Sequence, residues 1–500
     1  MGWKEAAEPV LTRMPTVRRP EGHVPFKRKL MWTAGILVLY FFLTNIALLG
    51  VQTGGANDLF GQFRSVLAGE MGSILQVGIG PIVTASIVLQ LLGGANLLGL
   101  DTDDPRDQVL YQGLQKLLVV IMTALTALPM VFAGDFLPAM QSLSLGGLQF
   151  DQTQVQLLIF AQIFAGGILL LYMDEVVSKW GVGSGIGLFI IASVSQSLVT
   201  GFLQPTQGGF FYNWYMIFTG EIQVGSLVSS DGLMTLLVTD QGGQLIALLT
   251  TLLIFGIVVY AESVRVEIPL SHARVKGARG RFPVKLIYAS VLPMILVRAL
   301  QANLQFIGQI LATQGGGNGE GPIVLFGREL AWLGTYSNGQ PDGGFFYYFA
   351  PIYSPADWMW FTADVGQEAW QVLIRMSIDV TFMVVGGAVF AIFWVETTNM
   401  GPEATAKQIQ NSGMQIPGFR QNVGVIEKVM ERYIPQVTVI GGALVGLLAV
   451  WANMLGTIGG VTGTGLLLAV SITYKLYEEI AEEQMMEMHP MMREMFGGGD

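Results

Sequence analysis

The sequence has no cysteine and only three histidines among its 500 residues. Without cysteine, neither disulfides nor thiolate metal sites can form. His23, His272 and His489 lie far apart, in segments that flank the apolar runs. Histidine ligation of a catalytic metal is therefore not expected.

Charge is also scarce, because 12% of the residues are charged and 52% are hydrophobic. An average soluble domain carries about 25% charged residues, so this chain cannot cover its apolar surface with charge. Apolar runs near the ~20 residues that cross a ~30 Å hydrocarbon core number about ten. We predict an all-α integral membrane protein with ten transmembrane helices. The predicted spans are 30–49, 74–92, 114–133, 155–171, 185–203, 245–260, 284–304, 372–395, 437–454 and 465–476.

No polar interval is long enough for a separate soluble domain, and we interpret the longest two, 201–244 and 313–371, as loops. The first apolar run is too long for the core of a cleaved signal peptide and is kept as a span. The expected organisation is an N-terminal segment 1–29, an N-terminal half 30–203, an external loop 204–244, a C-terminal half 245–476 with cytoplasmic loops 261–283 and 396–436, and a cytoplasmic tail 477–500.

The basic residues indicate the orientation, because cytoplasmic loops retain Lys and Arg during insertion. Nearly all of them fall in the N-terminal segment, in the C-terminal tail or in alternate loops on that same side. The loops 134–154, 201–244 and 455–464 contain none. Both termini are therefore predicted to be cytoplasmic, and the number of spans even. The exceptions are Arg64, Arg298, Arg328 and Arg375.

Acidic residues outnumber basic ones, 36 to 26, for a net charge of −10. Such an excess suits a salt-rich cytoplasm, where acidic surfaces stay hydrated. Ordinary acidic loops are the alternative interpretation.

Three charged residues fall within or at the start of apolar runs. Arg298 sits inside the seventh run, where a charge should face protein or water rather than lipid. Arg375 and Asp379 open the eighth run four residues apart, which permits an ion pair on one helical face. We hypothesise that Arg298 and this pair line a wet outer vestibule. The alternative is that Arg298 snorkels to the outer interface.

The segment 59–69 is too short to span a membrane and too apolar for an exposed loop. It resembles an amphipathic half-helix before the second span. Such a segment is tolerated at membrane depth only where protein or a water-filled cavity surrounds it. We therefore predict a cavity on the outer side.

Three spans open with glycine-dense sequence, at 77–83, 181–187 and 459–465. Small residues let helix backbones approach closely, so tight packing is the simplest interpretation. A dinucleotide-binding fingerprint is excluded, because it needs a soluble strand, turn and helix around it. The tripeptide Gly-Ser-Gly at 183–185 resembles Gly-Thr-Gly at 463–465, which fits an inverted repeat of five spans.

Several motifs resemble one known family. The segment 173–190, MDEVVSKWGVGSGIGLFI, is similar to the junction of the fourth and fifth spans in the SecY family, the large subunits of Sec translocons, in its archaeal and eukaryotic-like branch. Segments 78–85, 268–270 with 274–277, and 393–398 match the family in the same order. The resemblance covers nearly the whole chain. It implies two inverted five-helix halves with an hourglass pore and a short re-entrant plug between them.

The resemblance also implies a function and its residues. The family's large subunit passes unfolded secretory polypeptides through an apolar ring, and releases transmembrane segments through a lateral gate between spans two and three and spans seven and eight. Arg298 borders that gate, where small apolar residues are expected. The ring residues would be Ile79, Val83, Ile186, Ile190, Ile295 and Leu468. The plug residues would be Leu59, Phe60, Phe63, Arg64, Val66 and Leu67. Contact with the ribosome would fall to Arg274, Lys276, Arg279, Arg281 and Arg420.

The implied partners are small single-span subunits of the SecE/gamma and beta types, the ribosome with its nascent polypeptide, signal peptides and the bilayer of the cell membrane. Higher oligomers would also fit, and no cofactor is expected. The basic loops alone would also fit lipid headgroups, or the topology rule by itself. A secondary transporter would need ionisable residues near the midplane, where the ring positions are aliphatic. An intramembrane enzyme would need paired catalytic groups there, and no His, Cys or paired-carboxylate constellation falls at that depth. We therefore expect a non-enzymatic, passive conduit that is driven by its partners.

Overall fold

The computed structural model describes residues 8–22, 24–52, 64–94, 98–99, 105–132, 137–145, 148–206, 208–221, 235–237, 243–272, 279–285, 292–314, 321–325, 327–337, 340–360, 367–398, 400–411, 414–415 and 423–488.

Each of the ten predicted spans falls on a helix. In chain order these helices are α2 (Phe26–Thr44), α4 (Gly80–Gly94), α5 (Pro105–Phe132), α6 (Gln152–Trp180), α7 (Gly185–Leu203), α10 (Leu245–Ser263), α11 (Leu292–Gln314), α13 (Ala369–Thr397), α15 (Val423–Leu455) and α16 (Gly463–Met488). Within the described ranges, seven are long and apolar enough to cross a membrane: α5, α6, α7, α10, α11, α13 and α15. Helix α4 is shorter, because residues 74–79 form turns before it.

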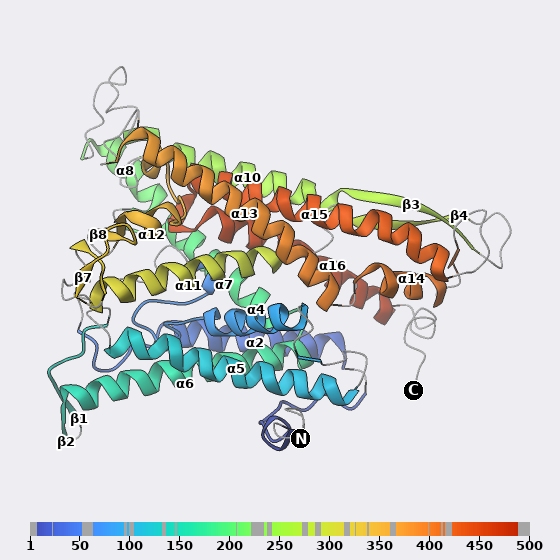
Figure 1. The fold of residues 1–500 in the computed structure, drawn as a ribbon, viewed down its shortest axis with the longest axis horizontal. Coiled ribbons are helices and arrows are strands. Elements are labelled where there is room, and N and C mark those ends of the chain that lie inside the picture. The colour runs from blue at the N-terminus through green and yellow to red at the C-terminus, as the bar shows by residue number, and fades with distance from the viewer. Residues whose placement is uncertain are drawn as a thin grey trace.

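The helices form two groups that meet along the centre of the molecule (Figure 1). Helices α2, α4, α5 and α6 lie on one side, and α10, α13 and α15 lie on the other, with α7 and α16 packed against each other between them. The start of α2 and the last turns of α16 lie at the same end of the bundle, joined by the Lys29–Glu483 ion pair, and we call this end the terminal end. The two five-helix halves predicted from the sequence are confirmed in this arrangement.

The terminal end also carries an antiparallel hairpin of β3 (Arg265–His272) and β4 (Arg279–Lys285). Strand β10 (Met414–Gln415) pairs with β3 and follows helix α14 (Pro402–Asn411). The hairpin corrects the predicted start of the seventh span. Residues 284 and 285 still pair with β3, so the start of the predicted span is strand, and the described helix α11 runs from Leu292 to Gln314.

The opposite end corrects the prediction that 201–244 and 313–371 are loops. The first interval contains helix α8 (Phe210–Thr219), and the second a three-stranded sheet beside the short helix α12 (Gly344–Tyr348). Aromatic side chains of this sheet and helix, Tyr336 and Phe346, are buried together. The small strands here are β1 (Ser142–Leu145), β2 (Leu148–Asp151), β5 (Gly321–Pro322), β6 (Val324–Leu325), β7 (Arg328–Glu329), β8 (Thr335–Ser337) and β9 (Gln340–Gly343).

Apolar side chains cover the outside of the bundle as well as its core. Helix α10 is apolar on all sides. Its residues Leu249, Leu252 and Phe255 are nevertheless each more than half exposed. A soluble protein rarely exposes such a continuous apolar surface. The helices therefore present their outer faces to lipid, as in a multi-pass membrane protein.

The last helix of each half begins in the same way. A Cβ at Gly185 would lie 2.6 Å from the Cα of Asp174 in α6, and one at Gly463 would lie 2.2 Å from the backbone carbon of Ala452 in α15. The predicted close packing at these glycines is confirmed. In each case a side chain of the preceding helix caps the new helix: Asp174 accepts from the Ile186 N–H at 2.9 Å, and Asn453 accepts from the Thr464 N–H at 2.8 Å.

Candidate functional site

The structure brings the six predicted ring residues into one buried apolar cluster. They come from both halves of the molecule: the start of α4 and α7 on one side, α11 and α16 on the other. Ile79, Val83, Ile190, Ile295 and Leu468 are at most 3% exposed, and Ile186 is half-buried against the same cluster. Residues up to 389 positions apart along the chain therefore share one buried core, and none of the six carries a polar side chain.

A short helix rests directly on this cluster. Helix α3 (Arg64–Leu67) contacts α7, α11 and α16, and its Val66 and Leu67 side chains are buried with the ring residues. The Leu67 carbonyl accepts from the Ile79 N–H at 2.7 Å, and the Ala68 carbonyl accepts from the Tyr40 hydroxyl at 2.9 Å. Two hydrogen bonds thus fasten the end of α3 to α4 and α2.

The predicted half-helix 59–69 needs one correction. Helix α3 ends at Leu67, because Ala68 adopts a left-handed backbone with φ of +50°. The predicted plug residues Leu59, Phe60 and Phe63 lie outside the described residues, and Arg64 is described for its backbone alone.

Gly78 allows α3 to sit so close. Its φ is +57°, and a Cβ there would lie 2.2 Å from the Leu67 carbonyl oxygen. An L-residue would meet both a strained backbone and a collision with a main-chain atom that cannot rotate away. The glycine-dense start of the second span therefore serves the docking of α3.

The two halves meet at a seam where α4 packs against α11 and α13. A small cavity there is bordered by Gly80 and Thr84 of α4, Thr126 of α5 and Ala299 of α11. The Asn303 amide donates to the Thr84 hydroxyl across the seam at 2.9 Å. Sequence analysis missed this pair, although an asparagine inside the seventh apolar run was a signal for it.

Arg298 is not in a wet vestibule, and it does not snorkel. Its side chain is 1% exposed, and it donates from Nε to Thr464 Oγ1 at 3.2 Å and from Nη1 to Gln301 Oε1 at 2.6 Å. Its Nη1 also lies 3.5 Å from Asp379 Oδ1, and Asp379 is likewise 1% exposed. Both hypotheses for Arg298 were wrong, because its side chain is buried inside the protein and faces Asp379 of the neighbouring helix, although its Nη2 has no hydrogen-bond partner among the described residues.

The local pair of Arg375 with Asp379 does not form either. Arg375 donates to the carbonyls of Ala350 at 2.9 Å and Pro351 at 2.7 Å, and its guanidinium stacks over the Tyr347 ring at 5.0 Å. It thereby ties the segment after α12 to the start of α13.

At the terminal end, the acidic last turns of α16 pair with basic residues from elsewhere. Glu478 pairs with Arg265 at 3.0 Å and with Lys285, at the base of the β3–β4 hairpin. Glu483 pairs with Lys29 of α2. One helix end is thus joined electrostatically to both halves.

The predicted ribosome-contact residues are only partly placed. Arg279 and Arg281 lie on β4, opposite Ser271 and Pro269 of β3. Their side chains, and the residues Arg274, Lys276 and Arg420, lie outside what the structure describes.

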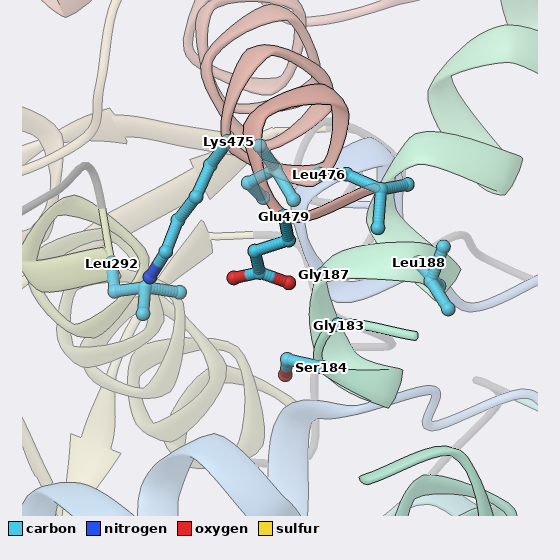
Figure 2. A pocket seen from close by; sticks show the side chains of 9 residues that line it. Gly183, Ser184, Gly187, Leu188, Leu292, Lys475, Leu476 and Glu479 are labelled. Atoms are coloured by element: carbon cyan, nitrogen blue, oxygen red, sulfur yellow. The ribbon is translucent and has the colours of Figure 1, made fainter. Parts of the chain in front are cut away.

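A pocket of about 50 Å³ lies between the start of α7 and the last turns of α16, with Ser184 and Glu479 on its wall (Figure 2). Sites for small organic ligands usually measure about 300–1,000 Å³, so this pocket is too small for one. Burial raises the pKa of the Glu479 carboxyl above its usual range, and nearby Glu482 and Glu483 add to the rise, whereas Lys475 opposes it. Over the described residues, no three His, Cys, Asp or Glu side chains are grouped to hold a metal ion.

Comparison with known proteins gives a consistent result. The sequence model of the SecY family matches residues 73–477, and that of the plug domain of Sec61p matches residues 38–72. The protein translocase subunit SecY of Haloarcula marismortui is 69% identical, covering 99% of this chain and 100% of that protein. The one of Halobacterium salinarum is 70% identical, covering 100% of both.

Solved structures agree with the sequences. One described as "The structure of a protein conducting channel" superposes with a TM-score of 0.76 at 36% identity, covering 97% of this chain and 98% of that one. Sec61 in the canine ribosome-channel complex from the endoplasmic reticulum superposes with a TM-score of 0.74 at 36% identity, with the same coverage. With the family model over most of its length and relatives matched end to end, this chain belongs to the SecY family.

Proposed function

We propose that the chain is the central subunit of a protein-conducting channel, and that unfolded secretory polypeptides cross the membrane through the ring of Ile79, Val83, Ile186, Ile190, Ile295 and Leu468. The observation that supports the proposal is that these six branched aliphatic side chains, from both halves, are buried in or packed against one apolar core, which also holds Val66 and Leu67 of α3. The relatives' name, protein translocase subunit SecY, supports it.

An apolar ring suits this task for a physical reason. A narrow aliphatic constriction gates by dewetting, so a hydrated ion would lose its water there without any compensating hydrogen bond. A passing polypeptide can push the side chains apart because they hold one another only by packing. In the resting state, α3 and the segment before it would act as the plug that closes the ring.

The seam of α4 and α5 against α11 and α13 is the lateral gate in this proposal. Its small side chains and its Asn303–Thr84 hydrogen bond hold it shut with little energy, since hydrogen bonds between membrane helices contribute about 0.6 kcal/mol on average and ~1.7 kcal/mol at most. Transmembrane segments and signal peptides would enter lipid there.

The terminal end would face the cytoplasm, as the distribution of Lys and Arg predicts. The membrane would be the cell membrane, as the family resemblance implies. The hairpin loop with Arg274, Lys276, Arg279 and Arg281, together with Arg420, would contact the ribosome through RNA phosphates. One structural relative is itself a ribosome-channel complex. Small single-span subunits of the SecE/gamma and beta types would complete the channel. The domains of the chain would be those given from the sequence, with the N-terminal half at 30–203 and the C-terminal half at 245–476.

The test uses the absence of cysteine. Single substitutions Ile190→Cys and Ile295→Cys would be made in reconstituted channels holding a secretory chain stalled during translocation, with a thiol crosslinker. We expect crosslinks at both positions. The matched control is Leu253→Cys on the lipid-facing side of α10, 53% exposed, which should give none. No crosslink at 190 and 295 despite correct insertion would refute the ring.

A further inference from the structure

Arg298 connects several elements of the C-terminal half from a fully buried position on α11. Its Nε donates to Thr464 of α16, and its Nη1 reaches Asp379 of α13. Gln301, one turn along α11, accepts from Arg298 and donates to Asp379 Oδ1 at 3.1 Å and to the Phe349 carbonyl at 3.1 Å. A single guanidinium therefore ties α11 to α13 and α16, and through Gln301 to the segment that follows α12.

The contact with α16 lies next to the ring. Arg298 is three residues after Ile295, and Thr464 is four residues before Leu468. Residues three and four apart share one face of a helix. The Arg298–Thr464 hydrogen bond thus joins the two helices within one turn of the ring residue on each.

Thr464 is itself held firmly, so the bond has a fixed end. Its N–H and its hydroxyl both donate to Asn453 Oδ1 of α15, at 2.8 and 3.2 Å. The hydroxyl oxygen accepts from Arg298 at the same time. The chain of contacts from α15 through α16 to α11 leaves little freedom for α11 to slide.

Stability alone does not account for this cluster. Removing an arginine and an aspartate from water costs several kcal/mol per ion, and buried ion pairs are often no better than packed apolar residues. The 3.5 Å separation of Arg298 Nη1 and Asp379 Oδ1 is long for a strong pair. The best-attested use of such a buried polar group is to fix the register of helices.

We propose that Arg298 is a positioning residue of the channel: it sets the register of α11 against α16, and thereby how tightly Ile295 and Leu468 meet in the resting ring. This inference rests on the proposed function for the role of the ring, but the register itself can be measured separately.

The register is measured on the other side of the ring. Leu292 of α11 and Ile472 of α16 line the same small pocket, one turn beyond Ile295 and Leu468. In the cysteine-free chain, Leu292→Cys with Ile472→Cys would be treated with thiol crosslinkers of graded length. The seal is measured as ion leak through resting channels in proteoliposomes.

Arg298→Met should remove the preference for one crosslinker length and raise the leak about tenfold or more, because the bond to Thr464 is lost and the buried Asp379 carboxylate loses its positive partner. The double variant Arg298→Met with Asp379→Leu removes both charges. It should insert and fold normally yet keep the loose register and the leak. The control Arg375→Met breaks the bonds to Ala350 and Pro351, which do not involve α16, and should change neither readout.

The outcomes separate the two ideas. An unchanged crosslinking pattern in folded Arg298→Met, or a double variant with a normal register, would overturn the positioning role. A loosened register with an unchanged leak would leave that role standing and would count against the ring as the seal.

Discussion

Gly78→Ala tests how firmly α3 is docked against the ring residues. The new Cβ would lie 2.2 Å from the Leu67 carbonyl oxygen and 2.7 Å from the Gly69 nitrogen, both main-chain atoms. The backbone at Gly78 has φ of +57°, which costs an L-residue roughly 1–2 kcal/mol. Because neither obstacle can rotate away, the end of α3 has to move off α4.

That movement breaks identifiable bonds. The Ile79 N–H loses the Leu67 carbonyl, and the Tyr40 hydroxyl loses the Ala68 carbonyl. Each bond contributes about 0.5–1.5 kcal/mol net. Together with the backbone strain, the docked state of α3 loses about 2–5 kcal/mol, which lowers the ratio of docked to undocked channels at least about 30-fold.

The assay is the resting ion leak of reconstituted channels, with thermal unfolding in detergent as a check on folding. Gly80→Ala is the matched control two residues away, because a Cβ there would meet only the Leu67 side chain at 3.8 Å, an ordinary contact. Gly78→Ala should leak and Gly80→Ala should not. If Gly78→Ala sealed as well as Gly80→Ala, the docking of α3 would not depend on this glycine.

Three further predictions concern polar contacts. Asn303→Ala should favour the open lateral gate by about 0.6–1.7 kcal/mol, and Thr84→Val should have the same effect, because each removes the same hydrogen bond. The readout is photocrosslinking of a signal peptide to lipid. Additive effects in the double variant would contradict a shared bond. Glu483→Lys should lower the melting temperature slightly at low salt and not at high salt, and adding Lys29→Glu should restore it. Because burial raises the pKa of Glu479, its charge opposes folding above that pKa, so Glu479→Gln should stabilise the protein near pH 7. The gain should vanish below about pH 4.5, where the carboxyl is protonated in both states; an unchanged gain there would contradict it.

The positions of the helices could be predicted because hydrophobic length is a local property. All ten spans were found, and the errors lay at their ends: 74–79 forms turns under α3, and 284–285 belongs to a hairpin whose other strand lies earlier in the chain. Whether a segment forms a strand depends on the strand that pairs with it, and an apolar run contains no information about that distant segment. The helix α8 and the small sheet of the opposite end were missed because their segments are short and rich in glycine and aromatics.

The buried position of the proposed ring residues could be predicted through family motifs, but the polar contacts around them could not. Asp379 has an arginine four residues away on its own helix, yet it pairs with Arg298, 81 residues away. Thr84 and Asn303 are separated by 219 residues. The presence of a buried ion pair also shows that aliphatic ring positions alone do not separate a channel from a transporter. Membership of the family makes that distinction.

The caps at the start of α7 and α16 bear on how the protein is made. The first N–H groups of a helix have no partner within it, and an unmet group in a membrane costs several kcal/mol. Here Asp174 of α6 and Asn453 of α15 supply one acceptor each to the helix that follows. During synthesis, the fifth and tenth helices therefore gain an acceptor for one of these first N–H groups when their predecessors are in place, which favours completing each half by the insertion of a helical hairpin rather than of a single helix.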